Sequence, residues 1–279
     1  MAVRFQNVCA GYRRGEPVLR EASGVFQAGA FTAVLGPNGS GKSTLLRTLV
    51  GALRPMTGSA SLETEGAEAM DLFSAPARAR ARRVAFVPQA GGPIFDYTAR
   101  EVVRLGRFTA RGRDDDRAVD AALEQVGLSH VARRPYPSLS IGQRQRVNVA
   151  RALAQLRLPI GDPPTDELAG KALLADEPVA AMDPKAAADT LGLLRELARA
   201  GAAVAVVLHD LSAAARYADR ALILSQEGRV VVEGRAEEVL GFEPTAANDD
   251  PLEAVFGVAF ERGEVGGARV VLPAGPPTR

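Results

Sequence analysis

The sequence of 279 residues predicts an α/β fold with a doubly wound core. Short, almost continuously apolar runs alternate with longer segments of helical periodicity, and this alternation is typical of parallel strands that are covered on both faces. The composition allows a substantial buried core, because 47% of the residues are hydrophobic and 24% are charged. At roughly 150 residues per domain, the length fits one large domain or two small ones.

The expected strands share a short run of β-branched or apolar residues. They are residues 31–35, 84–87, 171–175, 203–208 and 221–224. The expected helices share apolar residues at helical spacing. They are residues 42–53, 114–126, 143–156, 184–200 and 211–217.

Three segments depart from this alternation. Residues 93–137 carry helical periodicity without a convincing strand, so we expect a helical subdomain of about residues 93–150 inserted in a domain of residues 1–245. Residues 157–170 are rich in proline and glycine, which predicts a loop or an insertion. Residues 246–279 belong to a stretch rich in proline, glycine and alanine, end in PAGPPTR and are interpreted as a C-terminal tail that frays.

Charge and cysteine content exclude several classes of protein. The 34 Lys and Arg against 33 Asp and Glu give a formal net charge of +1, which does not support a nucleic-acid partner. The four arginines at positions 78, 80, 82 and 83 are interpreted as a solvated face. A single cysteine, Cys9, excludes an intrachain disulfide and a cysteine-rich zinc site, and favours a reducing compartment. No apolar run is long enough to span a bilayer, so we expect a soluble protein whose membrane role depends on a partner.

A glycine-rich segment after the first predicted buried strand has the pattern of a phosphate-binding loop. The eight residues GPNGSGKS match G-x-x-x-x-G-K-S and precede a predicted helix. Glycines allow backbone N–H groups to surround phosphate oxygens, Lys42 can reach the β- and γ-phosphates, and Ser43 supplies a hydroxyl for Mg²⁺. The residues assigned to ATP binding are Gly36, Pro37, Asn38, Gly39, Ser40, Gly41, Lys42, Ser43 and Thr44.

A second motif should complete the nucleotide site. In KALLADE, an apolar strand ends in Asp176, which suits Mg²⁺ coordination, and Glu177 follows it. A carboxylate beside the metal ligand is placed to polarise an attacking water. On its own the triplet DEP could be a solvated turn, and its pairing with the phosphate-binding loop favours the catalytic interpretation.

A third motif predicts another helix N-terminus that suits an anion. In LSIGQ, Ser140 and Gln143 have capping-box spacing ahead of a helical segment. About one hundred residues separate this turn from the phosphate-binding loop, so the two need not serve the same bound molecule.

With these motifs, nearly the whole chain resembles the ATP-binding subunits of ABC transporters. GPNGSGKS resembles Walker A, LSIGQ the signature, ALLADEP Walker B with Glu177 as hydrolysis glutamate, and AAMD the D-loop. Tyr12 is similar to the aromatic that stacks on adenine, Gln89 to the glutamine that contacts metal and water, and His209 to the switch histidine. The resemblance implies a P-loop NTPase core with an N-terminal antiparallel β part, and ATP and Mg²⁺ as cofactors, with Ser43, Gln89 and Asp176 near the metal.

The resemblance also implies a head-to-tail homodimer. Each ATP would lie between Walker A of one subunit and the signature of the other, where Ser140, Gly142 and Gln143 contact it in trans. Two departures from the family pattern are Ile141, where glycine is usual, and the sequence DEPVAAMD, in which Ala180 lacks the D-loop hydroxyl. We expect hydrolysis to survive both, with an effect on communication between the two sites.

The cargo is inferred only from likeness to a subfamily. Segments such as TAREVVRLGR and GRVVVEGRAEEVL resemble importers of haem, iron chelates and vitamin B12, and the proline-rich insertion is most like the haem importers. The resemblance implies two permease subunits as partners, a periplasmic binding protein as an indirect one, and a place on the cytoplasmic face of the bacterial inner membrane. Ile94, Phe95 and Tyr97 are the expected apolar anchors for the permease.

Other functional classes fit less well. DNA-repair relatives separate Walker A and signature by long coiled coils, and none is present here. Translation-factor relatives carry two cassettes in tandem. A degenerate, binding-only cassette is disfavoured because Lys42, Asp176, Glu177 and His209 are all present.

Overall fold

Three β-sheets and a group of helices form the described part of the structure, a computed structural model that describes residues 1–89, 96–109, 115–156, 168–243 and 250–275. An antiparallel sheet has the order β2-β1-β4-β5, and a larger sheet has the order β10-β9-β3-β8-β7-β6. The antiparallel strands are β1 (Ala2–Ala10), β2 (Leu19–Gln27), β4 (Thr57–Thr64) and β5 (Ala67–Asp71). The strands of the larger sheet are β3 (Phe31–Leu35), β6 (Val84–Val87), β7 (Ala172–Asp176), β8 (Ala203–Val207), β9 (Arg220–Leu224) and β10 (Val230–Arg235).

The larger sheet confirms the α/β core. Strands β9, β3, β8, β7 and β6 pair in parallel, and β10 joins antiparallel at one edge. All residues of β3, β7 and β8 are buried, which explains why their sequences are apolar without alternation. Side chains of β8 alternate between two hydrophobic clusters, with Val204 and Val206 in one and Ala203, Ala205 and Val207 in the other. Both faces of the sheet are therefore covered.

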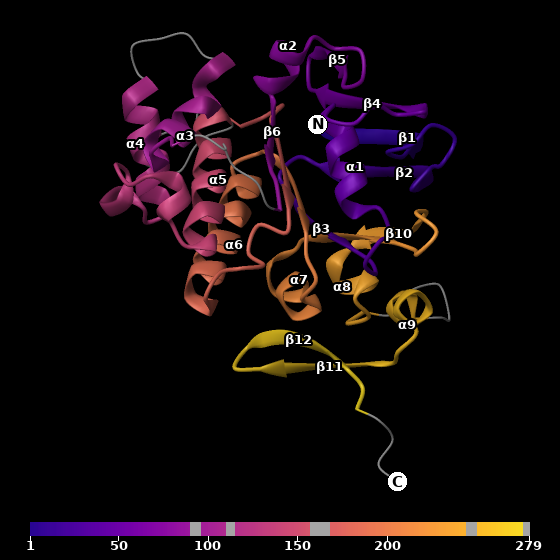
Figure 1. The fold of residues 1–279 in the computed structure, drawn as a ribbon. Coiled ribbons are helices and arrows are strands. Elements are labelled where there is room, and N and C mark those ends of the chain that lie inside the picture. The colour runs from indigo at the N-terminus through magenta and orange to yellow at the C-terminus, as the bar shows by residue number, and fades with distance from the viewer. Residues whose placement is uncertain (90–95, 110–114, 157–167, 244–249, 276–279) are drawn as a thin grey trace.

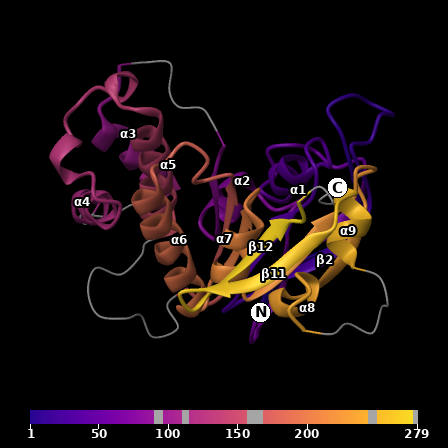
Figure 2. The ribbon, with the colours of Figure 1, turned by 90° about the horizontal axis from the view of Figure 1, so that it is seen from below.

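The helices differ from the predicted segments mainly at their ends. They are α1 (Lys42–Leu49), α2 (Ala77–Ala81), α3 (Ala99–Leu105), α4 (Asp115–Gln125), α5 (Ile141–Leu156), α6 (Pro184–Arg199), α7 (Leu211–Tyr217), α8 (Ala236–Val239) and α9 (Pro251–Phe256). Helix α1 ends before the predicted residue 53, because Gly51 has a φ of 73° that does not continue a right-handed helix. Helices α3, α4 and α5 lie together on one side of the molecule, away from α1 and the antiparallel sheet, in both views (Figures 1 and 2).

Some predictions fall outside the described residues. These concern Ile94, Phe95 and most of the insertion at 157–170. Within the described part of the chain, no helix is long and apolar enough to cross a membrane.

The C-terminal segment differs from the expected tail. Helix α9 is followed by an antiparallel hairpin of β11 (Phe260–Val265) and β12 (Ala268–Pro273), with Val265 paired to Ala268. Its two turn residues, Gly266 and Gly267, have φ values of 58° and 78°, which a two-residue hairpin turn requires. Val271 is only 3% exposed and belongs to the main hydrophobic cluster. The sequence signal of this hairpin is the pair GG between two short alternating runs. The proline and glycine content of the whole segment obscured that signal.

We expect Val271→Ala to destabilise the nucleotide-free chain by about 1–3 kcal/mol, because the substitution leaves a cavity in the main cluster. Leu272→Ala is the matched control, since Leu272 is the next residue and is 55% exposed. Thermal unfolding of both variants tests the hairpin. Equal, negligible effects would show that residues 268–273 behave as a frayed tail.

Candidate nucleotide-binding site

The phosphate-binding loop joins β3 to α1 through conformations that only glycine adopts easily. Gly36, Gly39 and Gly41 have φ values of 141°, 83° and 95°. A Cβ on Gly36 would also lie 2.4 Å from the carbonyl oxygen of Leu224. The loop is therefore closely packed against the strand β9. No side chain caps the N-terminus of α1, so the backbone N–H groups there are free of a side-chain cap and suit an anion.

Lys42 is folded into this loop. Its Nζ donates hydrogen bonds of 2.8 Å to the carbonyl oxygens of Gly36 and Pro37. Burial lowers the pKa of the Lys42 ammonium, and the negative charges of Glu177 and Asp176 act in the opposite direction. The buried hydroxyl of Ser40 has no hydrogen-bond partner among the described residues. An anion placed in the loop would pair with the ammonium and could accept from Ser40.

Ser43 and Asp176 form the group that suits a divalent cation. Ser43 Oγ donates to Asp176 Oδ1 over 2.8 Å, while the buried Asp176 Oδ2 has no hydrogen bond. Burial raises the pKa of the Asp176 carboxyl, and the Ser43 hydrogen bond and the charge of Arg47 partly offset this. A hydroxyl beside a buried carboxylate with an unpartnered oxygen fits the oxygen ligands that Mg²⁺ requires. These two residues would hold the metal, which would neutralise phosphate charge when bound.

Removing the Asp176 charge should stabilise the nucleotide-free chain. A carboxyl whose pKa is raised by folding destabilises the folded chain increasingly as the pH rises from the usual pKa of aspartate through the raised pKa. We expect Asp176→Asn to raise the free energy of unfolding by about 0.5–2 kcal/mol, as is common for strained functional groups. Thermal unfolding in EDTA at pH 7 measures this.

Asp71→Asn is the control for Asp176→Asn, because the pKa of Asp71 is lowered whereas that of Asp176 is raised. The Asp71 carboxylate accepts from the backbone N–H groups of Phe73 and Ser74, which lowers its pKa. Its substitution should leave stability unchanged or lower it. A loss of stability in Asp176→Asn comparable to that of the control would contradict the assignment of Asp176 as an unfavourably buried charge.

Three predicted catalytic residues lie at the ends of three neighbouring strands. Gln89 follows β6, Glu177 follows β7 and His209 follows β8. Glu177 Oε2 accepts from Gln89 Nε2 over 2.7 Å, and Glu177 Oε1 lies 2.6 Å from His209 Nε2. Glu177 has a φ of 48°, an uncommon conformation for a residue other than glycine. The structure thus brings the Gln89 and His209 side chains to the Glu177 carboxylate beside the phosphate-binding loop.

Arg47, which was not predicted as a site residue, lies between Tyr12 and Asp176. Its Nη1 donates to the hydroxyl of Tyr12 over 3.1 Å, and its Nη2 lies 4.0 Å from Asp176 Oδ2. The Tyr12 side chain is largely exposed, at 59%, so its ring is accessible to a planar partner. A signal was available, because Arg47 stands four residues after Ser43 on the same helix face.

The LSIGQ turn forms the predicted capping box at the start of α5. Gln143 N donates to Ser140 Oγ over 3.2 Å, and Ser140 N donates to Gln143 Oε1 over 3.0 Å. A Cβ on Gly142 would lie 2.8 Å from the carbonyl oxygen of Ala181, so the turn packs closely against the segment that follows Walker B. Ile141 is 64% exposed. Helix α5 lies apart from α1 in both views, so one chain does not bring this turn to its own phosphate-binding loop (Figures 1 and 2).

The basic run at residues 78–83 is only partly a solvated face. Arg80 donates to the carbonyl oxygens of Val50, Leu72 and Ala75, and is half-buried. Arg83 donates to Thr64 Oγ1. These two arginines therefore connect α2 and the start of β6 to neighbouring elements by hydrogen bonds. The interpretation as a solvated face is wrong for Arg80 and Arg83. His130 is exposed, as expected for an ordinary surface residue.

Comparisons with known proteins agree with one another. A family described as ABC transporter matches residues 19–166. The hemin import ATP-binding protein HmuV of Pseudomonas aeruginosa is 44% identical over 248 residues, which are 88% of this chain and 89% of that protein. The protein of the same name from Gloeobacter violaceus is 44% identical over 216 residues, or 76% of this chain and 74% of that protein. A solved dimeric post-hydrolysis structure of the ATP-binding cassette MJ0796, bound to ADP and Pi, has a TM-score of 0.70 and 29% identity, covering 84% of this chain and 98% of that chain.

Proposed function

This chain belongs to the ABC transporter family and is an ATP-binding ATPase, and we propose that it energises the uptake of haem by a bacterial importer. The observation that supports hydrolysis is that Gln89 and His209 both contact the Glu177 carboxylate. These three residues follow the carboxyl ends of β6, β8 and β7, where β7 ends in Asp176. Lys42 lies nearby at the start of α1. The cargo rests on the likeness to hemin import proteins over most of the chain.

The proposed reaction follows from these positions. The loop and Lys42 hold the β- and γ-phosphates, and Tyr12 stacks on the adenine. Glu177 accepts a proton from the attacking water, while His209 contacts the γ-phosphate and Gln89 orients the water and the metal. Ser43 and Asp176 would hold Mg²⁺, which would neutralise phosphate charge when bound.

The separation of α1 and α5 within one chain supports a homodimer as the functional unit. Each Walker A loop would face the Ser140–Gln143 turn of a second copy, so that each ATP bridges the two subunits. Cleavage of the γ-phosphate removes this bridge, and the dimer opens. Dimer closure and opening would then be transmitted to two membrane permease subunits, with a periplasmic binding protein delivering the cargo, at the cytoplasmic face of the inner membrane.

The cargo can be tested with the chain and its permease reconstituted in proteoliposomes. We expect the binding protein loaded with haem to stimulate ATP hydrolysis, and loading with vitamin B12 or a ferric siderophore to leave it at the basal level. Stimulation by vitamin B12 or a siderophore alone would replace haem as the cargo without affecting the ATPase assignment.

Permease docking is the second testable part. The expected anchors are Ile94, Phe95 and Tyr97, of which Tyr97 lies within the described residues and is 38% exposed. We expect Phe95→Ala to reduce transport by about tenfold, as for an apolar interface anchor, and to leave the basal ATPase of the isolated subunit unchanged. Transport assays and ATPase assays on the same preparation measure both. Equal loss in the two assays would contradict a docking role.

A further inference from the structure

The C-terminal hairpin contacts the helix that begins immediately after the switch histidine. His209 follows β8, Asp210 caps α7, and α7 runs to Tyr217. The Asp210 carboxylate accepts from the backbone N–H groups of Ser212 and Ala213, over 2.8 and 3.1 Å. The position of His209 is therefore set on one side by β8 and on the other by the first turn of α7.

Ser212 joins this first turn to β12. Its hydroxyl donates to the carbonyl oxygen of Val271 over 3.1 Å and accepts from the backbone N–H of Val271 over 3.0 Å. One side chain thus satisfies both polar backbone groups of Val271, a residue that is only 3% exposed. Strand β12 lies alongside α7 (Figure 2).

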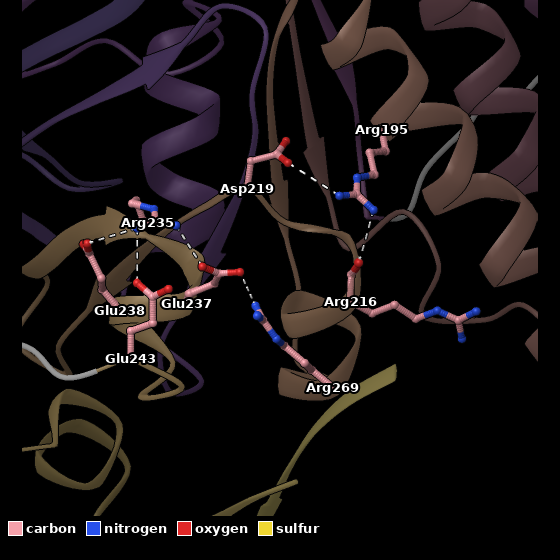
Figure 3. A network of polar contacts seen from close by, with 8 residues as sticks. All are labelled: Arg195, Arg216, Asp219, Arg235, Glu237, Glu238, Glu243 and Arg269. Carbon is pink, nitrogen blue, oxygen red and sulfur yellow. Dashed lines mark hydrogen bonds and ion pairs between the residues drawn. The ribbon is translucent and has the colours of Figure 1, made fainter. Parts of the chain in front are cut away.

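The opposite end of α7 is held independently. Arg195 of α6 donates to the carbonyl oxygen of Arg216 over 3.4 Å and lies 3.6 Å from the Asp219 carboxylate (Figure 3). Asp219 in turn accepts from the backbone N–H of Phe31, over 2.9 Å, at the start of the strand that leads to the phosphate-binding loop. The hairpin has a second attachment nearby, because Arg269 forms an ion pair with Glu237 of α8 (Figure 3).

The His209 side chain is 44% exposed, so packing encloses its ring only in part, and its polar contact among the described residues is the one with Glu177 at 2.6 Å. The orientation of a partly enclosed ring also depends on its backbone, which the first turn of α7 follows. Misplacing a group by about 1 Å can cost as much as 10²-fold in rate.

We propose that Ser212, held by Val271 of the C-terminal hairpin, is a positioning residue for His209, so that the hairpin is part of the hydrolytic machinery rather than a cover for the core. This inference rests on the proposed function, because it assigns a role to the hairpin in the reaction of the same site. A purely structural role of the Ser212–Val271 contact would instead predict a loss of stability without a change at His209.

The first test follows the His209 ring directly in the nucleotide-free full chain. The chain has two histidines, so His130→Gln leaves His209 as the one imidazole, whose ring Hε1 signal can be followed in a proton NMR spectrum. In that background, we expect Ser212→Ala to move or broaden the signal and Ser212→Thr to restore it. Leu272→Ala, on the exposed face of the same strand, is the control and should leave the signal in place. An unchanged signal in Ser212→Ala overturns the inference.

The second test uses ATP hydrolysis well below the melting temperature of each variant. We expect Ser212→Ala to lower kcat by about 5–10-fold with the KM for ATP changed less than about twofold, since chemistry rather than binding is affected. Ser212→Thr should return kcat to within about twofold of the wild type. In the His209→Ala background, Ser212→Ala should cause no further loss, because coupled residues are not additive.

The outcomes separate the inference from the proposed function. If His209→Ala lowers kcat and Ser212→Ala lowers it further by the same factor in both backgrounds, the positioning role is overturned while the ATPase assignment stands. If His209→Ala leaves kcat unchanged, the assignment of His209 to the reaction fails, and the inference fails with it. A residual rate too small to compare leaves the NMR result to decide.

Discussion

Glu177→Gln should lower kcat for ATP hydrolysis by about 10²–10⁴-fold, the range expected when a general base is removed. The amide keeps the size of the side chain and can still contact Gln89 and His209, whose nitrogens lie 2.7 and 2.6 Å from the carboxylate. It cannot take a proton from water. The KM for ATP should therefore change little, because Lys42 and the phosphate-binding loop remain intact.

The Glu177→Gln variant should also accumulate in an ATP-bound dimer. Size-exclusion chromatography with ATP and Mg²⁺ measures this, alongside phosphate release in a turnover assay. Glu21→Gln is a suitable control, because Glu21 belongs to β2 of the antiparallel sheet and pairs with Arg229 in an exposed ion pair, outside the group formed by Gln89, Glu177 and His209. Turnover by Glu177→Gln at the wild-type rate would remove Glu177 from the reaction.

The sequence allowed the buried sheet to be predicted well. Strands β3, β7, β8 and β9 lie inside the larger sheet and β6 lies at its edge. The continuous apolar runs of all five mark them within about one residue. The antiparallel sheet was expected only from the family resemblance. Its strands have one exposed face and contain irregular register, as between Phe5 and Val8 of β1, so their hydrophobic pattern is weaker.

The candidate site was predicted residue by residue but not as an arrangement. Gln89, Glu177 and His209 each follow a predicted strand, yet their contact depends on the order β8-β7-β6, which is set by non-local packing. Arg47 was missed because its partners, Tyr12 and Asp176, are distant in sequence. The Ser212–Val271 contact was missed for the same reason, and because the C-terminal segment was interpreted as a fraying tail.

Mixing two inactive variants should restore activity, because each proposed ATP site combines parts of two chains. Lys42→Ala removes the ammonium that lies in the phosphate-binding loop. Ser140→Arg places a bulky charge at the capping box of the LSIGQ turn. Each variant alone should lose at least about 10²-fold in ATPase activity, as expected when a preorganised phosphate contact is removed.

In a mixed dimer, one site combines the intact loop of the Ser140→Arg chain with the intact turn of the Lys42→Ala chain. Random pairing of equal amounts makes half of the dimers mixed, each with one of two sites intact, so about a quarter of wild-type activity should return if the sites act independently. Coupling between the sites would reduce this fraction, and Ala180 in the D-loop segment makes the size of the reduction informative. Mixing each variant with itself at the same total concentration is the control.

Complete absence of recovery, with mixed dimers demonstrated by differently tagged chains, would place the LSIGQ turn outside the ATP site of the partner or show that one site cannot turn over alone. A Lys42→Ala and Ser140→Arg double variant mixed with wild type separates these two cases: its mixed dimers contain two sites that each lack one part if the sites are shared, and one fully intact site if each chain uses its own turn.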